Sequence, residues 1–202
     1  MAEALESTHK TALVLRNKVV IVGDPTVGKS ALTQMFHTGG SVFPKNYVMT
    51  TYVDFAVKAV SIPDTSAQVE LYLFDLAGQS IFNVNDQAVP HWETANSLVL
   101  VFDVGSRDSF QSCAKWMAEI KAARAGSRPL PGVLVANKVD FRDTGRAEVS
   151  APEAMEFARR HGLEYFETSA ATGKDVDAPF NFLVNAFYRK YEERVKRLSG
   201  EA

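Results

Sequence analysis

Residues 23–30 read Gly-Asp-Pro-Thr-Val-Gly-Lys-Ser, and they follow the apolar run Val19-Val20-Ile21-Val22. A helix-like stretch from 31 to 36 comes next. A glycine-rich loop between a buried strand and a helix is the setting of a phosphate-binding P-loop. Its glycines let the backbone wrap closely, and its amides at the helix N-terminus offer hydrogen-bond donors to a polyphosphate.

The side chains of this loop predict a nucleotide polyphosphate with Mg²⁺. In a P-loop, the lysine, here Lys29, reaches the outer phosphates, and the hydroxyl of Ser30 holds the metal ion. The residues predicted to contact the nucleotide here are Asp24, Pro25, Thr26, Val27, Gly28, Lys29, Ser30 and Ala31.

A second motif predicts which base is bound. Asn137-Lys138-Val139-Asp140 directly follows the apolar run 133–136, so it lies at the carboxyl end of a predicted core strand, where open α/β sheets bind ligands. The Asp140 carboxylate can accept two hydrogen bonds from the paired N–H donors of guanine, whereas adenine presents an acceptor beside one donor. A polar site left unpaired discriminates on the order of 10⁴-fold, so we expect Asn137, Lys138 and Asp140 to select guanine.

Two further loops complete the predicted site. The strand-like run 71–75 ends in Asp75, which we expect to bind Mg²⁺ through water, and the amide of Gly78 can contact a terminal phosphate. Residues 167–171 follow a short apolar stretch. The loop residues Ser169, Ala170 and Ala171 are predicted to offer amides to the base carbonyl.

Four ordered motifs, in residues 23–30, 75–79, 137–140 and 169–170, make the chain resemble the Ras-like small GTPases over residues 17 to 190, and the Rab branch most closely. The resemblance implies that Thr50 is a ligand of Mg²⁺ and the γ-phosphate. It also implies that Phe43 lies edge-on against guanine, that Tyr47 closes over the phosphates, and that Gln79 orients the attacking water.

Departures from the Rab pattern narrow the resemblance. Tyr52 stands where Rab proteins have glycine, residues 74–80 read Phe-Asp-Leu-Ala-Gly-Gln-Ser, and Ala171 replaces a lysine. Pro25 has no N–H to donate and stands where fast Ras-like enzymes have a small residue, so the expected activity is slow hydrolysis of GTP to GDP and phosphate. Residues 198–202 hold no cysteine, so we expect no prenyl membrane anchor.

Residues 23–33, 43–50, 62–65 and 177–180 resemble the Rab-like GTPase subunit of intraflagellar transport complex B. That resemblance implies GTP or GDP and Mg²⁺ as cofactors, and a role in protein transport in the cilium or flagellum. It implies as partners a small β-sandwich subunit of the same complex and other subunits of that complex.

Composition sets the broad class. An apolar content of 46% in 202 residues supports one substantial core, and a formal charge of −2 gives no basis for nucleic-acid binding. The single cysteine, Cys113, fits a reducing compartment, and no 18-residue apolar run or signal peptide is present. We expect a cytoplasmic protein in which Cys113, Trp92 and Trp116 serve as packing residues.

Alternation of strands and helices predicts an α/β fold of the Ras-like P-loop type, with a doubly wound, mostly parallel six-stranded sheet, one antiparallel strand and about five helices. Strands are expected at 12–22, 52–60, 68–75, 97–103, 132–137 and 164–167, and helices at 29–38, 85–95, 107–124, 151–161 and 177–197.

Three segments are expected along the chain. Residues 1–11 are polar and unpatterned, which indicates a flexible tail, and 12–190 form the GTPase domain. Residues 191–202 form a helix extension and tail, in which apolar residues from Tyr191 to Leu198 recur at three- and four-residue steps beyond the expected core. This outer stripe predicts a docking surface for another protein.

Three function classes fit these observations. One is a switch that orders residues 43–52 and 75–85 around the γ-phosphate and releases them on hydrolysis, either in intraflagellar transport or as a general Rab-like trafficking switch. Another is a structural subunit that holds guanine nucleotide to stay folded. The third, a different P-loop enzyme such as a small kinase, is disfavoured by residues 137–140. Combining the first two classes, we expect a slowly hydrolysing GTP-binding subunit of a stable complex.

Overall fold

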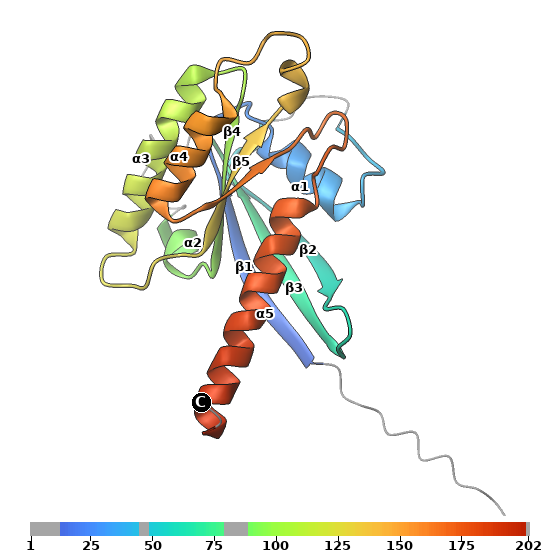
Figure 1. Ribbon diagram of the computed structural model, residues 1–202, viewed down its shortest axis with the longest axis vertical. Helices are drawn as coiled ribbons and strands as arrows, with labels where there is room; N and C mark the ends of the chain where they lie inside the picture. Colours follow the sequence, from blue (N-terminus) through green and yellow to red (C-terminus); the bar gives the residue numbers. More distant parts are fainter. Residues whose placement is uncertain (1–12, 45–48, 79–88, 201–202) are drawn as a thin grey trace, which may run out of the picture.

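The computed structural model describes residues 13–44, 49–78 and 89–200. Its elements follow one another as strand and helix for most of the chain (Figure 1). They are β1 (Leu13–Val22), α1 (Lys29–His37), β2 (Val53–Ser61), β3 (Ala67–Leu76), α2 (Val89–Glu93), β4 (Ser97–Asp103), α3 (Arg107–Ala123), β5 (Gly132–Asn137), a 3₁₀ turn η1 (Val139–Phe141), α4 (Ala151–His161), β6 (Glu164–Glu167) and α5 (Ala178–Ser199).

The predicted sheet is confirmed. Its six strands lie in the order β2-β3-β1-β4-β5-β6, and every pairing is parallel except that of β2 with β3. The hairpin between these two strands turns at Asp64, whose φ of 59° is left-handed. Two details differ from the expectation: η1 was not predicted, and α2 ends at Glu93 rather than at 95. The expected start of this helix, at 85, lies outside the described residues.

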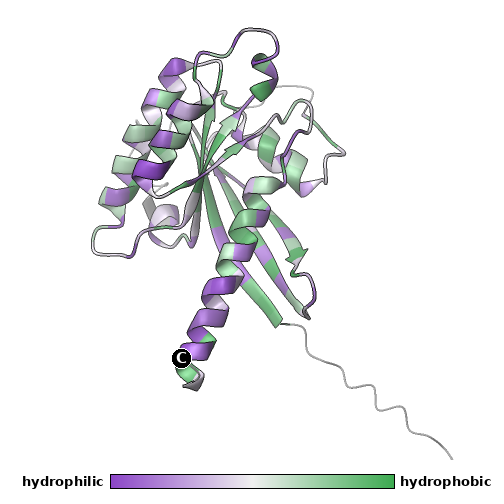
Figure 2. Ribbon diagram, viewed as in Figure 1, coloured by the Kyte–Doolittle hydropathy of each residue, from purple (hydrophilic) through white to green (hydrophobic). Residues whose placement is uncertain are grey.

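Alternate residues of the central strands face opposite sides of the sheet, which explains their continuous apolar character. Val20, Leu100 and Leu134 face α2, α3 and α4. Their neighbours Ile21, Val101 and Val135 face α1 and α5 on the other side. Figure 2 shows these hydrophobic strands between helices whose outer sides are hydrophilic.

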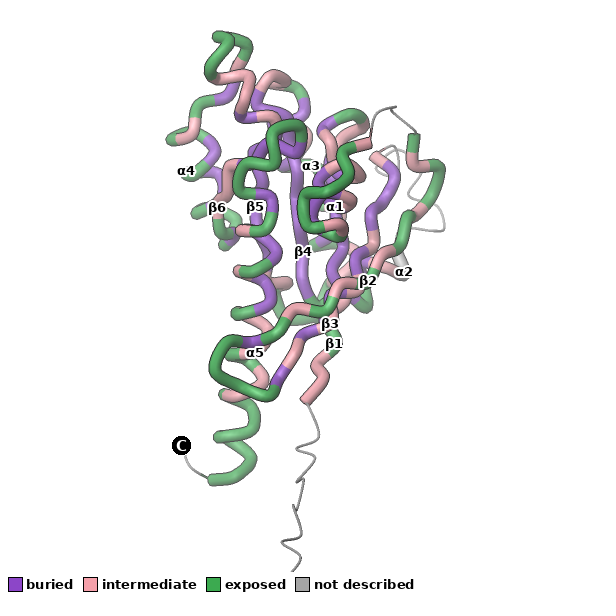
Figure 3. Tube along the Cα trace, turned by 90° about the vertical axis from the view of Figure 1, so that its right-hand side faces the viewer, coloured by how far each residue is buried: buried purple, intermediate pink, exposed green. Residues whose placement is uncertain are grey.

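Helix α5 runs past the sheet that it covers. Its first half buries Phe180, Leu183 and Val184, whereas residues 193–200 are all exposed. Figure 3 shows this exposed end of the helix projecting below the sheet. No helix in the described ranges is long and apolar enough to cross a membrane.

A stacked aromatic pair anchors α5 to α1, and we predict that it dominates the stability of this face. The Phe36 and Phe180 ring centroids lie 4.0 Å apart at 12°, and both side chains are buried. Phe180→Ala should lower the free energy of unfolding by about 3–5 kcal/mol because it removes a fully packed ring.

The measurement is urea unfolding at a fixed nucleotide concentration, since bound ligand also contributes to stability. The control is Leu198→Ala on the same helix, where the side chain is 80% exposed and a change within about 0.5 kcal/mol is expected. Equal midpoints for the two variants would contradict this account of the core.

Candidate functional site

The loop between β1 and α1 has a backbone that only glycine fits at two positions. Gly23 and Gly28 adopt φ values of 142° and 97°. A Cβ on Gly23 would lie 2.1 Å from the Val101 carbonyl oxygen, and one on Gly28 would lie 2.4 Å from Nδ2 of Asn137. Both glycines therefore allow the loop to pack directly on neighbouring strand ends. Gly28 is also the N-cap residue of α1 and has no side chain with which to cap the helix.

Lys29 is a buried ammonium with neutral partners. Its Nζ donates to the carbonyl oxygens of Gly23, at 2.8 Å, and Asp24, at 3.0 Å. Burial lowers the pKa of Lys29 to about 8, against the attraction of Asp75 and Asp24. A buried charge is costly unless it is paired, so this position fits an anionic ligand such as a phosphate.

Three oxygen-bearing side chains meet beside Lys29. The hydroxyl of Ser30 donates to Oδ2 of Asp75 and lies 3.0 Å from Oγ1 of Thr50. Asp75 is buried, and its Oδ1 has no hydrogen-bond partner within residues 13–44, 49–78 and 89–200. Burial raises its pKa to about 6, although the Ser30 hydrogen bond opposes this. Two hydroxyls and one orphaned carboxylate oxygen form the donor set that Mg²⁺ takes beside phosphates, so these residues fit the ion.

Gly78 lies against the P-loop. A Cβ on this residue would lie 2.3 Å from the nitrogen of Pro25 and 2.6 Å from the carbonyl carbon of Asp24. The glycine predicted to contact a terminal phosphate therefore lies against the loop predicted to bind the phosphates, and a side chain here would push the two loops apart.

The base-reading motif is tied to two other loops through buried side chains. Asn137 Nδ2 donates to the Val27 carbonyl at 2.9 Å, and Asn137 Oδ1 accepts from the Ala170 amide at 3.2 Å. Ser169 Oγ donates to Oδ1 of Asp140 at 2.6 Å, which holds that carboxylate in place. Residues more than 100 positions apart in the chain thus share one edge of the sheet.

Asp103 and Thr168 belong to this network and were not predicted from the sequence, whereas their partners Lys138 and Asn137 were. Lys138, at a left-handed φ of 63°, pairs with Oδ2 of Asp103 at 2.7 Å, and the Thr168 hydroxyl donates to Oδ1 of Asn137 at 3.2 Å. Asp103 ends β4 as Asp75 nears the end of β3. An acidic residue at the end of an apolar run was the signal that could have identified it.

The remaining residues predicted to bind nucleotide are less buried or lie outside the described part of the chain. Thr26, Phe43 and Ala171 are exposed, and Ala31 is half-buried on α1. Tyr47 and Gln79 lie outside the described residues. In the described part of the chain, no three His, Cys, Asp or Glu side chains cluster in a way that would hold a metal ion.

Comparison with known proteins identifies the relatives of this chain. The Ras family model matches residues 18–189. The intraflagellar transport protein 27 homolog of Bos taurus is 43% identical over 182 residues, which cover 90% of this chain and 95% of the relative. Intraflagellar transport protein 27 of Chlamydomonas reinhardtii is 45% identical over 183 residues, covering 90% and 88%. The human Ras-related protein Rab-30 is 35% identical over 163 residues, covering 81% and 75%.

The base-reading geometry yields a direct prediction for Asp140→Asn. The amide can still accept from Ser169, but it can also donate, so preference should move from guanine towards xanthine nucleotides. Competition of GTP, XTP and ATP against labelled GDP measures the shift. The matched control is Asp143→Asn, an exposed acid on the same loop, which should keep the wild-type order. Displacement of GDP by ATP as effective as that by GTP in the wild type would refute the assignment.

Proposed function

This chain belongs to the Ras family, and we propose that it is a slowly hydrolysing, guanine-nucleotide-binding subunit of the intraflagellar transport machinery. The observation that carries the nucleotide part is the convergence of Lys29, the Ser30–Thr50–Asp75 group and Asp140 at one sheet edge. The buried ammonium fits phosphates, the oxygen set fits Mg²⁺, and the held carboxylate fits guanine.

In this proposal each loop has a separate task. Lys29 binds the outer phosphates, Ser30 and Thr50 hold Mg²⁺ with Asp75 acting through water, and Asn137 and Lys138 support Asp140 beneath the base. Bound Mg²⁺ supplies neutralisation of charge on the phosphate oxygens. The amides of residues 24–31 and 169–171 surround the phosphates and the base carbonyl, while Phe43 and Tyr47 cover the base and the phosphates.

The proposed slow rate of hydrolysis rests on the contact of Gly78 with Pro25. Gln79 follows Gly78 directly, and in this family's mechanism it orients the attacking water. The proline ring occupies the P-loop surface against which Gly78 packs, and proline offers no amide there. A proline therefore leaves less room beside the γ-phosphate than a glycine at this position would, which favours slow hydrolysis.

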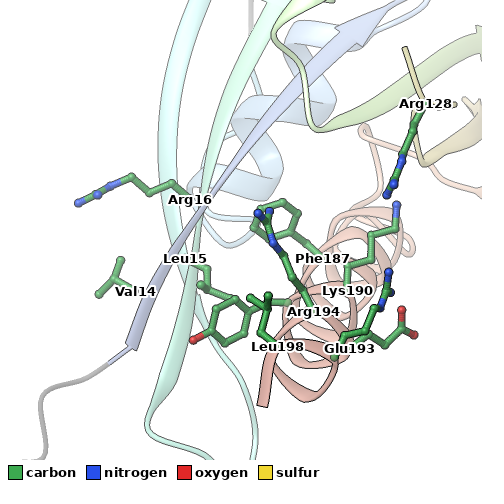
Figure 4. A pocket seen from close by; sticks show the side chains of 11 residues that line it. Val14, Leu15, Arg16, Arg128, Phe187, Lys190, Glu193, Arg194 and Leu198 are labelled. Carbon is green, nitrogen blue, oxygen red and sulfur yellow. The ribbon is translucent and has the colours of Figure 1, made fainter. Parts of the chain in front are cut away.

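The transport part of the proposal rests on the relatives and on a groove at the other end of the molecule. A groove of about 970 Å³ lies between the start of β1 and the outer half of α5. Figure 4 shows Leu15, Phe187 and Leu198 with the basic side chains Arg128, Lys190 and Arg194 around it. Its only acidic lining residue in the described chain is Glu193, so an acidic, partly apolar partner surface fits it.

We assign this groove to the small β-sandwich subunit of intraflagellar transport complex B, and the protein to the cytoplasm and the cilium or flagellum. A general Rab-like trafficking switch is the second candidate. Its support is the set of exposed aromatic side chains Tyr52 and Phe55 beside the site, which a nucleotide-dependent partner could read.

Thr50→Ala tests whether the site responds to the γ-phosphate. The hydroxyl should reach Mg²⁺ only when residues 43–52 close, so GTP affinity should fall at least tenfold while GDP affinity changes less than threefold. Equilibrium binding of both nucleotides measures the ratio. Lys29→Ala is the comparison variant and should weaken both nucleotides. Equal losses for GTP and GDP in Thr50→Ala would favour a structural subunit that does not switch.

A chain that ends at Arg189 tests the docking groove. It should bind GTP as the full chain does but lose co-purification with the β-sandwich subunit, because it lacks Lys190, Arg194 and Leu198. In the full-length chain, Leu198→Asp should also release the partner. Met155→Asp, which is 52% exposed on α4, is the control and should retain it. Stoichiometric binding by the shortened chain would place the interface elsewhere.

A further inference from the structure

Trp116 of α3 reaches the P-loop through its indole nitrogen. Its Nε1 donates to Oδ1 of Asp24 at 2.9 Å, and the side chain is 1% exposed. Burial alone agrees with the packing role that the helical pattern predicts. The hydrogen bond adds a contact between α3 and the loop that the packing role does not explain.

Asp24 is the point at which several parts of the site meet. Its carbonyl oxygen accepts from Lys29 Nζ, and its carbonyl carbon lies where a Cβ on Gly78 would approach to 2.6 Å. Any displacement of this residue therefore moves both a partner of the buried ammonium and the surface on which Gly78 rests.

Pro25 makes an external hold on Asp24 more important. Proline has no amide with which to fix this part of the loop, and it restricts the preceding residue to extended conformations. The carboxylate of Asp24 is the side-chain group by which the segment can be held, and Trp116 occupies it. A hydrogen bond to a charged acceptor is stronger than one between neutral groups.

We propose that Trp116 is a positioning residue for the phosphate end of the site. Its indole N–H holds Asp24, and through Asp24 it fixes the position of Lys29 and of the loop surface that Gly78 contacts. This inference rests on the proposed nucleotide binding. It assigns to α3, a helix outside the nucleotide motifs, control over how tightly GTP is retained. Because Gly78 is expected to meet only the terminal phosphate, the effect should be larger for GTP than for GDP.

The neighbouring Trp92 provides a matched control. The two rings pack edge to face with centroids 6.3 Å apart, and Trp92 is also 1% exposed. Its Nε1 has no hydrogen-bond partner among the residues that the structure describes. Trp92→Phe and Trp116→Phe thus remove the same atoms from the same core cluster, but only the second removes a hydrogen bond.

The experiment measures release of radiolabelled GTP and GDP from the full-length protein by filter binding, with thermal midpoints recorded for each variant. Trp116→Phe should release GTP at least fivefold faster than the wild type and raise the ratio of GTP to GDP release at least threefold. Trp92→Phe should leave both rates within twofold, with a comparable midpoint. In an Asp24→Ala background, Trp116→Phe should cause no further acceleration.

Equal release rates for Trp116→Phe and Trp92→Phe would overturn the inference, as would additive effects of Trp116→Phe and Asp24→Ala. If Trp116→Phe does not fold, the test moves to Asp24: Asp24→Asn keeps an acceptor oxygen and should release GTP more slowly than Asp24→Ala, and equal rates would overturn the inference. A wild type that does not bind GTP refutes the proposed function itself, whereas normal wild-type binding with equal variants refutes only the role of Trp116.

Discussion

The side chain of Asn137 is the constraint on which the rest of the site depends. It is buried and bonds at once to the P-loop through Val27, to residue 170 through its amide, and to the hydroxyl of Thr168. Gly28 has to lack a side chain because Asn137 already occupies that space. The loops after β1, β5 and β6 are therefore placed relative to one another by a single amide group, and the separation between base and phosphate sites follows from it.

Two buried charged groups beside this framework lower the stability of the protein when no ligand is bound. Burial lowers the pKa of Lys29 and raises that of Asp75, because keeping either group ionised away from water costs free energy. A phosphate would neutralise the charge of Lys29, and a divalent cation would neutralise that of Asp75. The chain thereby gives up stability in the empty state, and a ligand that binds only the folded form restores it.

The sequence predicted the strands closely because the runs 19–22, 98–102 and 133–136 are continuously apolar and buried, and the first and last of them are followed directly by a predicted nucleotide motif. It predicted Asp75 and Asn137 because they lie at strand ends, and Lys29 because it opens the helix after the glycine-rich loop. The bond from Trp116 to Asp24 was not predictable, because it joins residues 92 positions apart and leaves no periodic signal. Nor did the pattern reveal η1, whose three residues are too few to show a helical repeat.

Strand β1 extends from the groove beside Leu15 to the P-loop after Val22, so the two proposed surfaces lie at opposite ends of one rigid element. Ten residues of strand span roughly 33 Å. Substitutions at one end share no side-chain neighbours with those at the other, and their free-energy effects should therefore add. A lineage can in consequence remodel its assembly partner while its nucleotide chemistry stays fixed, or lose hydrolysis while the assembly persists.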